Sequence, residues 1–147
     1  MIVSFFGYSK YAEQEGHFEK MLSLLEEKIG DTPVMFYVGS HGNFDLFAIK
    51  CALEYRKRHS NATVIYVTPY LNCNNAEHLI KKCDGSIYPE IEKTPLRFAI
   101  IKRNEWVINR SDFLVFYYKH IGKTRNFFEY ATRKHKDLIN VADILIQ

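Results

Sequence analysis

The stretch VMFYVGSHGNFDLFA, residues 34–48, decides the fold of this 147-residue chain. It begins with a continuous apolar run, Val34–Val38, which is typical of a strand buried on both faces of a parallel sheet. A polar loop with two glycines, Gly39 and Gly42, comes next, and apolar residues then recur with the spacing of one helix face. The stretch therefore predicts a strand–loop–helix unit of an α/β domain.

The same alternation extends over the whole chain. Four more apolar runs lie at residues 2–6, 64–67, 113–117 and 138–141. Helical spacing of apolar residues separates the runs, at residues 18–29, 44–55, 98–108 and 127–131. The pattern predicts a doubly wound, Rossmann-like α/β fold with a mainly parallel five-stranded sheet, the strand order 3-2-1-4-5 and helices on both faces.

Residues 69–95 interrupt this alternation. The segment holds three of the four prolines, and it predicts a long connection with one short helix at residues 76–82. Connections of this length in a compact domain are typical of lids over a pocket and of contacts between subunits.

The composition indicates one globular domain, residues 1–147, with 47% hydrophobic and 25% charged residues. No apolar run approaches the roughly 20 residues that a spanning helix needs, and residues 1–6 lack the features of a signal peptide. Cys51, Cys73 and Cys83 match no zinc pattern, so we expect free thiols in a reducing compartment. These features predict a cytoplasmic protein without a membrane partner.

Three loops follow strands whose carboxyl ends meet where the strand order reverses, and ligands bind there in open α/β sheets. Glycines let the backbone approach a ligand, while backbone N–H groups at a helix N-terminus suit a phosphate. The alternatives stay open: Gly7 is also read as an ordinary turn glycine, and Asn43 or Asp45 as helix caps. The candidate ligand-binding residues in the loops are Gly7, Tyr8, Ser9, Gly39, Ser40, His41, Gly42, Asn43, Asp45, Gly122, Lys123 and Thr124.

A hydrolase triad and a metal site are not expected. Ser40, His41 and Asp45 lack the G-x-S-x-G turn of a nucleophilic serine, and adjacency in sequence is not triad geometry. His41 and His120 both follow strands, but no paired carboxylate or third ligand accompanies them.

Residues 122–124 read Gly-Lys-Thr, as at the end of a P-loop, yet Tyr117 occupies the position of the first P-loop glycine. No G-x-G-x-x-G motif exists anywhere in the chain. The sequence therefore predicts neither a P-loop NTPase nor a dinucleotide oxidoreductase, and no cofactor is expected.

Polar or charged residues also lie inside two predicted helices, with Arg103 and Asn104 in the third and Glu129 in the fourth. One interpretation is a solvated helix edge. The other has Glu129 in the crevice as an acid–base or ribose-binding group, with Arg103 and Asn104 beside it and Arg103 holding a phosphate.

These segments together resemble the SLOG superfamily, the Rossmann-like ligand-binding domains of the DprA-like and LOG-like proteins, and most closely its small bacterial members. The similarity covers nearly the whole chain and rests on residues 37–45, 67–70, 98–104, 111–113 and 128–131. It implies a pocket for a nucleotide or a nucleotide derivative. Relatives are commonly dimeric or larger, so the resemblance also implies a homo-oligomer.

In LOG-type members, an arginine before the fourth strand and a glutamate in the following helix cleave the N-glycosidic bond of nucleoside monophosphates. Arg103 and Glu129 fall on these positions and are the catalytic candidates that the resemblance implies. The loop before the glutamate reads Pro-Gly-Gly-x-Gly-Thr in those enzymes, and residues 120–125 here read HIGKTR. Other members sense signalling nucleotides and need only the pocket.

Three functions follow, in order of preference. The first is a module that senses or sequesters a phosphorylated, nucleotide-derived small ligand. The second is a nucleoside 5′-monophosphate phosphoribohydrolase or related N-glycosidase. The third is DprA-like binding of nucleic acid, which a net charge of only +3 does not favour.

Overall fold

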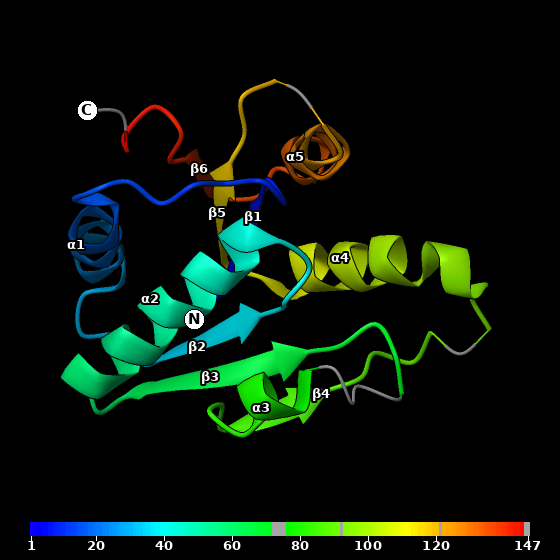
Figure 1. Ribbon diagram of the computed structural model, residues 1–147, viewed down its shortest axis with the longest axis horizontal. Helices are drawn as coiled ribbons and strands as arrows, with labels where there is room; N and C mark the ends of the chain where they lie inside the picture. Colours follow the sequence, from blue (N-terminus) through cyan, green and yellow to red (C-terminus); the bar gives the residue numbers. More distant parts are fainter. Residues whose placement is uncertain (72–75, 92, 121, 146–147) are drawn as a thin grey trace.

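The computed structural model describes residues 1–71, 76–91, 93–120 and 122–145. In this part of the chain, six parallel strands form one sheet in the order β4-β3-β2-β1-β5-β6 (Figure 1). The strands are β1 (Ile2–Gly7), β2 (Val34–Val38), β3 (Ala62–Val67), β4 (Gly85–Ile87), β5 (Phe113–Tyr117) and β6 (Leu138–Asn140). The helices are α1 (His17–Ile29), α2 (Asn43–Arg58), α3 (Glu77–Ile80), α4 (Ala99–Arg110) and α5 (Thr124–Arg133), with a 3₁₀ turn, η2 (Leu96–Phe98), before α4.

The predicted order of the five apolar strands is confirmed, and β4 is an additional strand at the edge of the sheet. It belongs to the segment that the sequence predicted as a connection. No apolar run marks it, because Ser86 is exposed and Gly85 and Ile87 are only partly buried. Asp84 fixes it in place, since its side chain accepts a hydrogen bond from the Val64 N–H at 2.8 Å and its own N–H donates to the Val64 carbonyl at 2.8 Å. The short helix predicted at 76–82 is α3.

Helices cover both faces of the sheet, as the continuous apolar strands require. α1 and α2 pack on one face, where Leu22 and Ala52 are buried beside Phe36 of β2. α4 and α5 pack on the other face, where Ile108 and Ala131 are buried. Figure 1 shows these two layers on either side of the strands.

The order of the strands reverses between β1 and β5, which are paired in parallel. α1 follows β1 onto one face and α5 follows β5 onto the other, so the two connections leave this point in opposite directions (Figure 1). A crevice therefore opens at the carboxyl ends of these strands, where the sequence placed the candidate loops.

Within the described residues, no helix is long and apolar enough to cross a membrane. Cys51 and Cys83 are free thiols, and Cys73 lies outside the described residues.

Candidate functional site

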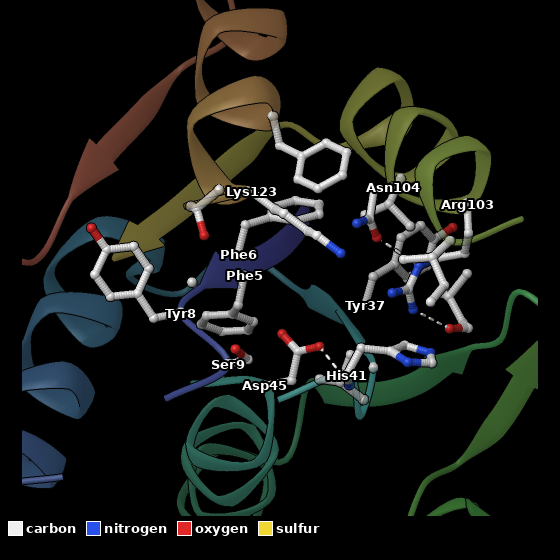
Figure 2. A pocket seen from close by; sticks show the side chains of 18 of the residues that line it. Phe5, Phe6, Tyr8, Ser9, Tyr37, His41, Asp45, Arg103, Asn104 and Lys123 are labelled. Carbon is white, nitrogen blue, oxygen red and sulfur yellow. Dashed lines mark hydrogen bonds between the residues drawn. The ribbon is translucent and has the colours of Figure 1, made fainter. Parts of the chain in front are cut away.

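A cavity of about 530 Å³ opens at the carboxyl ends of β1 and β2 and is flanked by α4 and α5 (Figure 2). Its volume is within the range of about 300–1,000 Å³ that is usual for small-molecule sites. The lining residues are Phe5, Phe6, Gly7, Tyr8, Ser9, Lys10, Tyr37, Val38, Gly39, His41, Asp45, Val67, Ile100, Arg103, Asn104, Val107, Gly122, Lys123, Thr124 and Phe127.

The cavity brings together most of the site residues that the sequence suggested. All three loops contribute, and α4 adds its neighbouring arginine and asparagine. The residues predicted from the sequence that line it are Gly7, Tyr8, Ser9, Gly39, His41, Asp45, Arg103, Asn104, Gly122, Lys123 and Thr124.

Ser40, Gly42 and Asn43 were also predicted, but they lie outside the lining and contact β3 or the loop after β1 instead. The Ser40 hydroxyl is hydrogen bonded to the hydroxyl of Tyr66. The Asn43 N–H donates to the Ser9 carbonyl at 2.9 Å. Gly42 has a φ of 130°, and a Cβ there would lie 2.5 Å from the Cα of Ser9. Glycine is therefore required at position 42 by the contact between two loops.

Glu129 does not have the crevice-facing position that one interpretation gave it. Its side chain is 48% exposed and accepts a hydrogen bond from Arg125 Nε at 3.0 Å, one turn earlier on α5. The reason is the helical period. Thr124 and Ala131 are buried on one face of α5, and positions 125 and 129 lie together on another.

Arg103 is the deepest cation of the site and is only 4% exposed. Its Nη1 donates to the Val67 carbonyl at 2.8 Å, and its Nε donates to Asn104 Oδ1 at 2.7 Å. The guanidinium lies against Gly39, where a Cβ would come within 2.6 Å of Nη1. Burial lowers the pKa of Arg103 and the nearby charge of Asp45 raises it, and an arginine remains cationic under such conditions.

Asp45 and His41 are titratable neighbours of Arg103 in the site. Asp45 Oδ2 accepts a hydrogen bond from the His41 backbone N–H at 2.9 Å. Burial raises the pKa of Asp45, against the opposing effects of Arg103 and of that hydrogen bond. Burial and the charge of Arg103 lower the pKa of His41 to about 4, so its imidazole is neutral at pH 7. Its Nε2 is buried without a hydrogen-bond partner in the described part of the chain.

Positive charge predominates around the cavity. Lys10, Lys123 and Arg103 line it, and Asp45 is the carboxylate among the lining residues described. In Figure 2, His41 is drawn near both Arg103 and Asp45, and Lys123 comes from the start of α5. An excess of cations in a concave site attracts an anionic ligand and binds it through charge-assisted hydrogen bonds.

The two helix N-termini near the cavity differ in what they offer. At α2, the N–H groups of Asn43 and Phe44 already donate to the carbonyls of Ser9 and Tyr8. At α5, the N–H groups of Arg125 and Asn126 donate to the carbonyls of Gly122 and Lys123. Lys123 and Thr124 themselves line the cavity. The positive end of the α5 dipole therefore faces the same space as the lysine side chain.

Four residues of the apolar wall of the cavity, Phe6, Tyr37, Ile100 and Val107, were not among the site residues predicted from the sequence. Phe6 and Tyr37 extend from β1 and β2, and Ile100 and Val107 come from α4. The available signal was the apolar strand and helix pattern itself, which assigns such residues to the core without distinguishing those that border a cavity. Flat aromatic surfaces of this kind suit the ring of a base.

The described residues contain no group of three His, Cys, Asp or Glu side chains that could hold a metal ion. The sequence matches no family model and no curated protein.

Proposed function

We propose that this protein binds a phosphorylated, nucleotide-derived small molecule in the cavity and senses or sequesters it. One observation carries the proposal: a single cavity at the reversal of strand order combines an apolar, partly aromatic wall with three cationic side chains. A ligand that fits both features has a flat ring and a phosphate.

The proposed ligand has a definite orientation. Its phosphate lies at the N-terminus of α5, where Lys123 supplies a charge-assisted hydrogen bond and Lys10 adds charge. Its ring lies against the wall that includes Phe6 and Tyr37. The free carboxylate oxygen of Asp45 accepts hydrogen bonds from ribose hydroxyl groups. The resemblance of the loops to those of SLOG domains supports the same class of ligand. The free thiols of Cys51 and Cys83 support a cytoplasmic location.

N-glycoside hydrolysis is the second candidate, and one observation favours it. Asp45 is a carboxyl group in the cavity with a raised pKa, which is a property of catalytic acids. In such a reaction Asp45 would take the acid–base role for which the sequence had suggested Glu129. Arg103 would hold the phosphate or stabilise developing charge.

The test is to incubate the purified protein with an equal concentration of each compound in a nucleotide panel, ultrafilter the mixture and read the filtrate by mass spectrometry. The panel contains AMP and other 5′-monophosphates, NAD, ADP-ribose and cyclic ADP-ribose. Depletion of an intact compound supports binding, and free base with ribose 5-phosphate supports hydrolysis. Full recovery of every compound would refute both candidates.

A pair of variants ties the result to the cavity. Ile100→Trp fills the cavity from α4 and should prevent depletion. Leu46→Trp adds the same ring at an exposed position of α2 outside the lining and should have no effect. Equal behaviour of the two variants would place the ligand elsewhere.

A homo-oligomer is part of the proposal. Leu96 and Phe98 of η2 are exposed to 78% and 42%, and apolar side chains in such positions often belong to subunit contacts. Light scattering on the purified protein tests this, and a monomeric mass would contradict it.

A further inference from the structure

A second pocket of about 420 Å³ adjoins the cavity at the same end of the sheet. It lies on the face that carries α1, since Tyr11 and Leu145 belong to the core on that side. The lining residues are Tyr8, Lys10, Tyr11, Ala12, Gln14, His17, Tyr117, Lys119, Ala142 and Leu145. No function proposed so far uses this pocket.

Tyr8 and Lys10 line both the pocket and the cavity, so the segment after β1 is the partition between them. The Tyr8 hydroxyl accepts a hydrogen bond from the Lys119 N–H at 2.7 Å. The Tyr8 ring packs edge-on against Tyr117, with 5.8 Å between the ring centroids. A molecule that spans the partition therefore passes Lys10.

His17 supplies a hydrogen-bond donor to the second pocket, although its side chain is only 4% exposed. Its Nδ1 accepts the Gln14 N–H at 3.2 Å and is also hydrogen bonded to the Tyr11 hydroxyl at 2.7 Å. A backbone N–H can only donate, so Nδ1 is the acceptor and the ring proton of the neutral imidazole is on Nε2. Within the described residues, this Nε2–H donates to no protein group.

The pocket also carries positive charge and aromatic surface. Lys10 and Lys119 line it, and the described lining contains no carboxylate. Lys119 Nζ lies 5.6 Å from the centroid of the Tyr117 ring, which is a cation–π distance. These groups suit a sugar or a ring that is attached to a phosphate.

We propose that the ligand has two ring-bearing halves joined by a pyrophosphate, with one half in each pocket. This inference rests on the proposed function, because the first half is the nucleotide in the cavity. The pyrophosphate lies over Lys10, the cation that the two pockets share. The second half lies among the tyrosines, where a hydroxyl or carbonyl oxygen accepts the proton of His17 Nε2.

Calorimetric titration with AMP, ADP-ribose and NAD tests the inference. For the wild type, ADP-ribose or NAD should bind at least about tenfold more tightly than AMP, since the second pocket adds contacts without a second association step. Ala12→Trp fills the second pocket at an exposed position, and Lys119→Glu reverses an exposed charge there. Both variants should abolish the tighter binding of ADP-ribose and NAD relative to AMP, and both should leave the affinity for AMP unchanged.

The matched control is Lys57→Glu, which reverses an exposed charge on α2 outside both pockets. Lys57→Glu should still bind ADP-ribose and NAD more tightly than AMP. A second measurement needs no variant: the ¹⁵N signal of His17 Nε2 should move when ADP-ribose or NAD is added and stay in place with AMP.

Failure of the second pocket and failure of the nucleotide site give different results. If AMP binds, but the two-part compounds bind no more tightly or Ala12→Trp keeps their advantage, the second half of the site is refuted and the proposed function stands. If none of the three compounds binds to the wild type, the nucleotide site itself is refuted and this inference is refuted with it.

Discussion

Gly39 and Arg103 are packed so closely that a Cβ on residue 39 would lie 2.6 Å from Nη1 of the guanidinium. The two residues are far apart in sequence, and one follows β2 while the other lies in α4. The missing side chain of Gly39 leaves the space in which the buried cation reaches the Val67 carbonyl. Gly39 therefore leaves room for the Arg103 guanidinium as well as for a ligand.

Gly39→Ala should displace the guanidinium and break its bond to Val67. Leaving buried polar groups unpaired costs about 1–3 kcal/mol of unfolding free energy, which urea denaturation would measure. Gly85→Ala is the control, because a Cβ there would find its nearest atom, in Ile65, at an ordinary 3.6 Å. Equal losses in the two variants would contradict the packing described.

Lys123→Ala should weaken binding of the nucleotide that the panel identifies by at least about tenfold, because a charge-assisted hydrogen bond contributes about 1.5–3 kcal/mol. Lys123 is exposed, so unfolding free energy should change by less than about 0.5 kcal/mol. Lys57→Ala is the control for removal of an exposed lysine. Calorimetry measures the loss of affinity. Unchanged affinity in Lys123→Ala would show that the phosphate does not bind at the N-terminus of α5.

His41 should make the protein less stable in mild acid. Its pKa is about 4 in the folded protein against an ordinary 6.5, so below pH 6.5 the unfolded chain takes up a proton that the folded protein does not. Stability is lost as the pH falls from 6.5 towards 4, by about 2 kcal/mol at about pH 5. Asp45 acts in the opposite sense, since its raised pKa favours protonation of the folded protein.

Urea denaturation of His41→Gln at about pH 7.5 and about pH 5 measures this contribution. The variant should lose less stability on acidification than the wild type. His78→Gln, at an exposed position of α3, should keep the wild-type dependence. If the stability of His41→Gln depends on pH as the wild type does, the imidazole of His41 is not the group that resists protonation in the folded protein.

Asp45→Asn should raise the melting temperature at pH 7 and weaken ligand binding at the same time. Burial of the carboxylate disfavours its charged form, and an asparagine oxygen can still accept the His41 N–H. The lost affinity follows from the weaker acceptor that it presents to ribose hydroxyl groups. Such opposition between stability and binding is typical of functional sites.

Asp143→Asn, at an exposed position, is the control for loss of one carboxylate. Thermal melts and calorimetry on both variants provide the comparison. A lower melting temperature in Asp45→Asn would mean that attraction to Arg103 outweighs the cost of burial.

Five of the strands could be predicted because each contains a short, mostly apolar run, which is typical of a parallel sheet. The strand order was predicted from the alternation of these runs with helices. β4 could not be predicted. Its residues Gly85–Ile87 form a partly exposed edge strand that depends on pairing with β3 and on the side chain of Asp84.

The sequence by itself determined the doubly wound fold and the three loops that meet at the reversal of strand order, because local patterns decide which element each residue joins. Only the tertiary structure decided which side chains enter the site. The packing of α4 on the sheet brings Arg103 against Gly39, and the rotation of α5 directs Glu129 to solvent. The physical reason is distance along the chain: a helix pattern indicates which face is buried, but the partner of that face depends on how remote elements pack.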